Sequence, residues 1–231
     1  MSIRINASLA SVVAISVATI AFSHGDVAPQ PVNTDLLPDV GEEWLLENPY
    51  RVETAGLDVW LNAVEIGASG YNQNCARCHG LEVVSGGLAP DLRYIEAEEY
   101  GDEWYTERFI HGYTQNGITR MPGFGELLGQ KAAWAIRTYI ETRPDDEAMA
   151  EVSPDLMAIR DQLLAWDSAG ETGDTAPIVT ALDEISDNIE TLSGAPVAES
   201  VAFRASRILQ ADPEAYKSAA ETLTVGLSAA N

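Results

Sequence analysis

Cys75-Ala76-Arg77-Cys78-His79 is the stretch on which the interpretation of the whole chain depends. Its two cysteines are the only ones among 231 residues, and a histidine follows the second directly. The pattern C-x-x-C-H is typical of a c-type haem attachment site, in which both thiols add to the haem vinyl groups. His79 would then bind the iron as its proximal ligand. Zinc fits poorly, because a structural zinc site needs four ligands and there is no second cysteine pair.

A haem iron has a second axial position, and the sequence offers few side chains for it. Met121 precedes Pro-Gly-Phe and an apolar helix, so we expect it on a stiffened loop as the second ligand. His/Met ligation raises the reduction potential, which suits electron transfer. His111 is the alternative and would give a bis-histidine haem of low potential. Met149 and Met157 lie in a helical region and are expected to pack in a core.

Other residues are candidates for the haem pocket. A ligating histidine usually donates its second ring N–H to a carbonyl, and Pro90 or its neighbour, on a proline-stiffened turn, is the candidate acceptor. Haem propionates need donors, for which the candidates are Arg93, Trp104, Arg108 and Arg120. Each arginine has an alternative role as a counter-charge on an acidic surface, and Trp104 could belong to the core.

Residues 1–23 have the pattern of a secretory signal peptide. Arg4 precedes an apolar run over residues 7–22, and Ala21-Phe22-Ser23 is a small-x-small cleavage site. Cleavage there would export the protein to the periplasm with His24 as its first residue; an uncleaved anchor is the alternative. No later apolar run reaches spanning length, so no membrane span is expected after cleavage.

The charge of the chain limits its partners. Aspartate and glutamate number 36 against 13 lysines and arginines, which gives a net charge of −23. This balance argues against nucleic acid as a partner, because phosphate binding needs clustered basic residues. An acidic surface can dock on a basic patch of another protein, although it can also serve solubility or a saline habitat.

The pattern of apolar residues predicts an all-α protein with one haem domain and a helical extension. Residues 24–56 are rich in proline and predict an irregular arm over the domain. Residues 57–144 contain helical patterns at 57–71, 98–111 and 129–142. Residues 145–231 predict a small helical bundle: one helix opening at Ser153-Pro154, a coiled-coil-like stripe over 178–192, another helix near 201–208, and a last one after Asp212-Pro213-Glu214.

Residues 57–143 resemble a class I cytochrome c domain. The features that carry the resemblance occur in the family's order: Gly67-x-x-x-Tyr71, Cys75-Ala76-Arg77-Cys78-His79-Gly80, Ala89-Pro90-Asp91-Leu92, Met121-Pro122-Gly123-Phe124 and Trp134 to Tyr139. The resemblance implies that the helix containing Gly67 and Tyr71 crosses the helix of residues 134–139.

Residues 24–143 are more narrowly similar to the periplasmic cytochromes c-550 that serve quinoprotein (PQQ-dependent) alcohol dehydrogenases. This resemblance rests on residues 70–82, residues 85–92, residues 24–30 and Gly41-Glu-Glu-Trp44. It implies one covalent haem c with thioethers at Cys75 and Cys78 and with His79 and Met121 as axial ligands. The extension over 145–231 departs from the family.

A haem with two protein ligands has no open site for a substrate, so we expect an electron carrier and not an enzyme. It would accept electrons from a quinoprotein alcohol or methanol dehydrogenase and pass them toward a terminal oxidase or a second cytochrome. Two alternatives remain: a haem enzyme or gas sensor, if Met121 leaves the iron, and a subunit fixed in a larger oxidoreductase complex, with residues 145–231 as the docking module.

Overall fold

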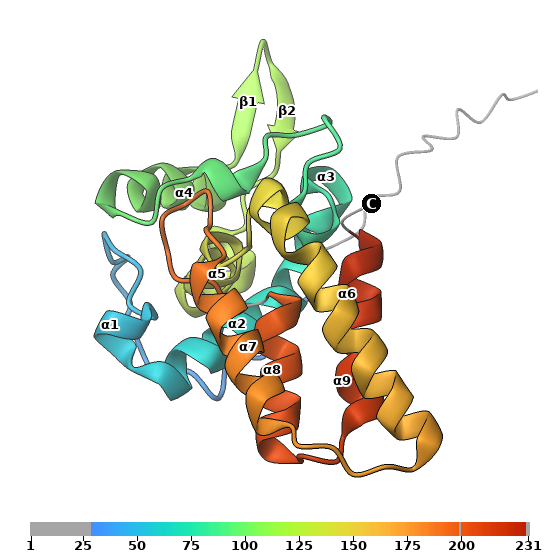
Figure 1. Ribbon diagram of the computed structural model, residues 1–231. Helices are drawn as coiled ribbons and strands as arrows, with labels where there is room; N and C mark the ends of the chain where they lie inside the picture. Colours follow the sequence, from blue (N-terminus) through green and yellow to red (C-terminus); the bar gives the residue numbers. More distant parts are fainter. Residues whose placement is uncertain (1–28, 199, 230–231) are drawn as a thin grey trace, which may run out of the picture.

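The computed structural model describes residues 29–198 and 200–229, and the regular secondary structure of this part of the chain is helical except for one hairpin (Figure 1). The expected signal peptide and His24 lie outside the described residues. Within them, no helix combines the length and apolarity that crossing a membrane requires. The elements are α1 (Val52–Ala55), α2 (Leu57–Asn74), α3 (Ala76–His79), the 3₁₀ turns η1 (Leu81–Val83) and η2 (Leu92–Tyr94), α4 (Glu99–His111), β1 (Tyr113–Gln115), β2 (Ile118–Met121), α5 (Gly125–Glu141), α6 (Asp146–Ala169), α7 (Ala176–Asn188), α8 (Val201–Ala211) and α9 (Tyr216–Ala229).

The N-terminal domain, residues 29–144, is built on the crossing of α2 and α5. A Cβ atom at Gly67 would lie 1.9 Å from the carbonyl oxygen of Ala135, so only glycine allows the two helices to approach this closely. One turn later the rings of Tyr71 and Tyr139 are 5.5 Å apart. The crossing implied by the resemblance is confirmed. The predicted irregular arm packs Leu37 and Tyr50 against Trp134 and also contains α1.

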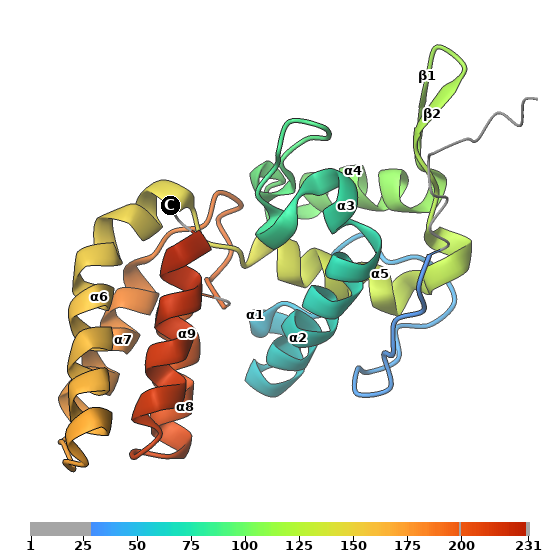
Figure 2. The ribbon, with the colours of Figure 1, turned by 90° about the vertical axis from the view of Figure 1, so that its right-hand side faces the viewer.

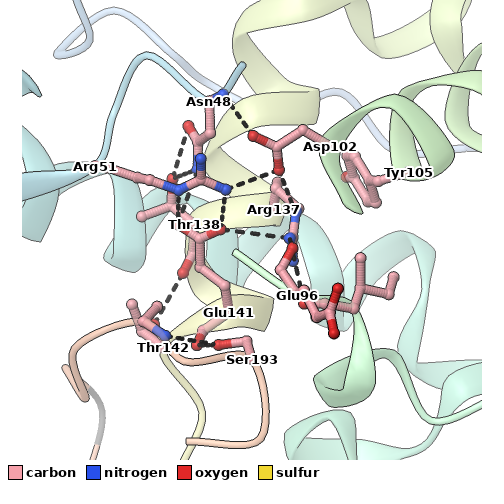
Figure 3. A network of polar contacts seen from close by, with 12 residues as sticks. Asn48, Arg51, Glu96, Asp102, Tyr105, Arg137, Thr138, Glu141, Thr142 and Ser193 are labelled. Carbon is pink, nitrogen blue, oxygen red and sulfur yellow. Dashed lines mark hydrogen bonds and ion pairs between the residues drawn. The ribbon is translucent and has the colours of Figure 1, made fainter. Parts of the chain in front are cut away.

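A network of buried charges lies beneath this arm (Figure 3). Arg137 of α5 donates from Nε to Asp102 Oδ1 at 2.9 Å, and both side chains are fully buried. Arg51 donates to the same oxygen at 2.8 Å and to Glu141 Oε2 at 2.9 Å. The backbone N–H of Asn48 donates to Asp102 Oδ2 at 2.8 Å. These bonds tie α4, α5 and the arm together at one point.

A β-hairpin replaces the loop expected before Pro122. Strands β1 and β2 pair antiparallel, and the turn between them contains Asn116 at φ 52° and Gly117 at φ 75°. Positive φ at both positions is typical of the two-residue turns that match the twist of a hairpin. Met121 therefore ends a strand, opposite Tyr113, rather than lying on a loop. The hairpin projects from the N-terminal domain (Figures 1 and 2).

Helices α6–α9 form a separate four-helix lobe, the C-terminal bundle (Figure 2). Its own core contains Leu156, Leu163, Leu182, Leu209 and Leu223, each no more than 1 % exposed. Met149 is buried in this core as expected, whereas the expectation for Met157 was wrong, because Met157 is 36 % exposed.

Two expectations about the helices of the extension were also wrong. Pro154 lies inside α6, which begins at Asp146; packing along α9 outweighs the proline's preference for a helix start. The stripe over 178–192 is not one helix, because α7 ends at Asn188.

The chain leaves the N-terminal domain at Pro144 and returns to it between residues 190 and 198. The Ser193 hydroxyl donates to the carbonyl of Glu141 at 2.5 Å, and Ala97 N–H donates to the carbonyl of Ser193 at 2.9 Å. Ala198 is fully buried in the hydrophobic cluster of the N-terminal domain. Apart from this returning segment, the chain passes from the N-terminal core to the core of the C-terminal bundle near residue 144.

Candidate haem attachment site

The motif begins where α2 ends. Cys75 N–H donates to the carbonyl of Tyr71 at 2.7 Å, and His79 N–H donates to the carbonyl of Cys75 at 3.0 Å. Residues three and four apart share a face of a helix, so the turn α3 places Cys78 and His79 beside Cys75. Cys75 and His79 point toward the core, while Cys78 is exposed.

Gly80 turns the chain away from the motif. Its φ is +88°, and a Cβ atom there would lie 1.8 Å from the carbonyl oxygen of Val84. The Tyr71 hydroxyl donates to the carbonyl of Gly80 at 2.9 Å. Helix α2 therefore fixes both ends of the pentapeptide.

The His79 imidazole has the carbonyl partner that a metal-binding histidine usually has. His79 Nδ1 lies 2.9 Å from the carbonyl oxygen of Pro90, which can only accept, so Nδ1 carries the proton. The other nitrogen, Nε2, has no hydrogen-bond partner in the described part of the chain. This is the tautomer that presents a lone pair on Nε2 to a metal.

Arg93 is held by carboxylates rather than offered to a propionate. It donates to both oxygens of Asp91, at 2.7 and 3.1 Å, and to both oxygens of Asp146, at 2.9 and 3.1 Å. A longer bond of 3.4 Å reaches the carbonyl of Pro144. A guanidinium has five N–H groups, and these bonds use all of them. The role proposed for Arg93 from the sequence is therefore corrected.

The other propionate candidates lie at the base of the hairpin. The Arg108 guanidinium stands 5.2 Å from the ring of Trp104 and 5.6 Å from that of Tyr113, and it pairs with Glu107 at 2.9 Å. Arg120 is exposed on β2. Within the described residues no hydrogen bond or ion pair joins Trp104, Arg108 or Arg120 to the pentapeptide.

Met121 belongs to the same packing unit as the attachment motif. It is half-buried and packs, as Cys75 does, against the hydrophobic cluster that includes Ala76, Phe109 and Phe124. His111, the alternative ligand, is exposed at the end of α4. Met121 thus contacts the hydrophobic cluster that Cys75 also contacts, whereas the imidazole of His111 is exposed.

The donor set fits a covalently attached haem. Two free thiols lie one helical turn apart, His79 carries its proton on Nδ1 and so presents the lone pair of Nε2 to a metal, and a thioether packs in the adjoining core. Burial raises the pKa of the Cys75 thiol to about 12, and Cys78 adds to the shift. Without haem in the folded chain, this thiol is therefore protonated at neutral pH.

Comparison with known proteins agrees with this geometry. The chain is 51 % identical over 133 residues to the cytochrome c550 of Pseudomonas aeruginosa, a match that covers 58 % of this chain and 90 % of that protein. The chain belongs to the cytochrome c550 family. It is thus a c-type cytochrome, a haem protein of electron transfer. Residues 62–140 also match the family model described as cytochrome c oxidase, cbb3-type, subunit III.

Two longer relatives share a similar segment. The quinohemoprotein alcohol dehydrogenases ADH-IIG and ADH IIB of Pseudomonas putida are each 31 % identical to this cytochrome, over 84 and 87 residues. The matches cover 36 and 38 % of this chain but only 11 and 12 % of the dehydrogenases. No solved structure matches the chain significantly.

The sequence did not reveal two carboxylates that form ion pairs near the attachment motif. Asp146 and Glu82 carry no recognisable motif, and their pairing with Arg93 and Arg143 joins segments 53 and 61 residues apart. The hairpin had a signal that could have found it, since Asn116-Gly117 stands between Tyr, Thr and Ile residues.

Proposed function

We propose that this cytochrome is a periplasmic one-electron carrier with a single haem c, which accepts electrons from a PQQ-dependent alcohol dehydrogenase and passes them toward a terminal oxidase or a second cytochrome. Cys75 and Cys78 hold the haem through thioethers, and His79 and Met121 are its axial ligands. When bound, the haem supplies the redox centre. The chain supplies the His79 imidazole in a fixed tautomer and the hydrophobic cluster against which Cys75 and Met121 pack.

The observation that carries this proposal is the His79–Pro90 contact of 2.9 Å beside two free thiols. It orients the imidazole, and pairing a histidine with a thioether ligand favours a high potential. The pairing with a dehydrogenase is supported by the two Pseudomonas putida relatives, whose names join a quinone cofactor and a haem in one alcohol dehydrogenase.

Reduction by a partner enzyme tests the electron pathway. The ferric protein is mixed with a catalytic amount of a PQQ-dependent alcohol dehydrogenase and alcohol, and the absorbance of the ferrous haem is followed. We expect rapid reduction that depends on the alcohol and slows as salt screens the acidic surface. Absence of reduction at micromolar cytochrome would exclude the pairing while leaving the haem assignment intact.

Replacing the second ligand tests the coordination. Met121→Ala opens the sixth position, so the ferrous variant should bind carbon monoxide and its ferric form should lose the long-wavelength methionine-to-iron band. Met157→Ala is the matched control, because Met157 lies on α6 at 36 % exposure. Carbon monoxide binding by the wild-type ferrous protein would instead support the haem enzyme or sensor.

A fixed subunit of an oxidase is the second candidate, favoured by the description of the family model that matches residues 62–140. In that case the C-terminal bundle would be the docking module. Size-exclusion chromatography of a membrane extract and of the periplasm separates the two: a free carrier elutes from the periplasm at the size of one or two chains.

A further inference from the structure

The neck, residues 142–146, joins α5 to α6 and contacts the segment that follows the haem motif. Arg143 donates from Nη2 to Glu82, and its guanidinium lies 5.2 Å from the ring centre of Tyr139. Four residues of chain separate Glu141 from Asp146, whose carboxylate binds Arg93. The neck therefore forms charged hydrogen bonds with Glu82 and Arg93, which lie on either side of Pro90 in the sequence.

The segment between these two contacts, residues 82–93, begins with strained backbone. Glu82 has φ 56° and Val83 has φ 67°. Non-glycine residues rarely adopt these angles, and a β-branched residue such as valine is a genuine outlier there. Such strain persists only where the surroundings over-determine it. Here the Val83 side chain is fully buried, and the side chain of Glu82 is held by Arg143.

The other end of the segment is held by two carboxylates on one guanidinium. Arg93 is 6 % exposed and makes a bidentate pair with Asp91 and another with Asp146. Asp91 already neutralises Arg93, so the pair with Asp146 is not needed for charge balance. Its geometric effect is to fix the plane of the guanidinium, because bidentate pairs constrain direction as well as distance.

These contacts form a continuous path to the proximal ligand. Asp146 holds Arg93, Arg93 holds Asp91, and Asp91 directly follows Pro90, whose carbonyl accepts from His79 Nδ1. The strength of that last hydrogen bond controls how basic the ligating imidazole is. A shift of the carbonyl would therefore change the relative stability of the ferric and ferrous states.

We propose that Asp146 is a positioning residue for the proximal histidine, through which the neck and the C-terminal bundle set the reduction potential of the haem. This inference rests on the proposed ligation of the iron by His79. It gives the extension, which the family resemblance does not account for, a role in the domain it follows.

The test compares Asp146→Asn with Glu147→Gln in the haem-loaded protein. Both changes remove one negative charge from an exposed side chain in the first turn of α6. Asp146 binds Arg93, whereas Glu147 makes no hydrogen bond or ion pair within the described chain. Reduction potentials are measured by spectroelectrochemical titration. Exchange of the His79 Nδ1 proton is measured by NMR of ¹⁵N-histidine-labelled ferrous protein. Asp146→Glu, which keeps the carboxylate, is the rescue variant.

We expect Asp146→Asn to raise the potential, because a weaker hydrogen bond leaves the imidazole a poorer donor to ferric iron. We expect its His79 proton to exchange about tenfold faster, the effect of weakening one hydrogen bond. Glu147→Gln should leave exchange unchanged and shift the potential less, and Asp146→Glu should restore most of the wild-type behaviour.

Equal shifts of potential in Asp146→Asn and Glu147→Gln, with exchange unchanged in both, would overturn the inference, because the effect would then be that of charge alone. That result would leave the proposed function standing. The state of the haem is checked separately, by haem staining after denaturing electrophoresis. Wild-type protein without covalent haem would overturn the proposed function and this inference with it.

Discussion

Asp102→Asn tests the buried charge network of the N-terminal domain. Asparagine keeps the shape of aspartate, so the change creates no cavity and removes only the charge and one acceptor. The amide oxygen can still accept from Arg51 and Arg137. The amide nitrogen, however, would face the Asn48 N–H that now donates to Asp102 Oδ2 at 2.8 Å, which sets two donors against each other.

The magnitude follows from what remains around Arg137. Removing one member of a buried ion pair costs about 3–5 kcal/mol, because the other charge is left uncompensated. Glu141 lies 3.7 Å from Arg137 Nη2 and offsets part of this loss, so the lower limit of about 3 kcal/mol applies. For a chain of this size that corresponds to a midpoint lower by about 6–12 °C.

The assay is thermal unfolding of the haem-loaded protein, followed by circular dichroism in the Soret region and in the far ultraviolet. The Soret signal reports the N-terminal domain, whereas the far-ultraviolet signal also includes the C-terminal bundle. We expect the Soret midpoint to fall by the amount given. Asp102→Asn should leave the covalent haem in place, since the network does not contact the pentapeptide.

Glu103→Gln is the matched control, one residue along the same helix with an exposed side chain. Its effect should stay within about 0.5 kcal/mol, as for surface substitutions in general. A Soret midpoint of Asp102→Asn within about 2 °C of that control would refute the reasoning. It would show that Glu141 and the backbone alone stabilise the buried arginine.

Three further changes test other parts of the structure. Gly67→Ala should destabilise the folded protein by at least about 1–3 kcal/mol in urea, because its Cβ would meet the backbone of Ala135; the exposed Asn72→Ala in the same helix should not, and equal effects would contradict the close crossing. Desolvation raises the pKa of Asp91, but hydrogen bonds and charge from Arg93 outweigh it, so the pKa is lowered in the folded protein. The ionised Asp91 carboxylate therefore stabilises the fold fully above the ordinary pKa of about 3.9, and this stabilisation is lost as the pH falls through the lower pKa of the folded state. The stability gap between wild type and Asp91→Asn should therefore narrow below about pH 4, and a gap independent of pH would oppose this. In the haem-free protein iodoacetamide should alkylate the exposed Cys78 well before Cys75, whose pKa burial raises to about 12; mass spectrometry after partial digestion gives the order, and equal rates would argue against a buried Cys75.

The attachment site could be predicted from sequence because its chemistry is local. The pentapeptide places two thiols and an imidazole on one helical turn, so residue spacing alone determines their arrangement. Gly67 and Tyr71 were informative for a similar reason: a small residue and an aromatic at i and i+4 mark the face of a helix that another helix crosses closely.

The polar contacts could not be predicted because they join distant segments. Asp102 and Arg137 look like ordinary solvated charges of an acidic chain, and only the folded arrangement of α4 and α5 buries them together. Arg93 was a candidate for binding a propionate because nothing in the sequence indicates that Asp146 lies beside it. The helix start predicted at Pro154 was wrong for the opposite reason. The local preference of proline for the first turn of a helix was outweighed by packing along the whole length of α6.

The returning segment around Ala198 has a consequence for limited proteolysis. The loop between α6 and α7 lies at the far end of the C-terminal bundle from the neck (Figures 1 and 2). A protease that cuts there divides the chain into a fragment with the haem and α6 and a fragment with α7, α8 and α9. The second fragment still packs on α6 through α9 and still anchors on the N-terminal domain through Ser193 and Ala198. The nicked cytochrome should therefore migrate as one particle under native conditions and as two only after denaturation.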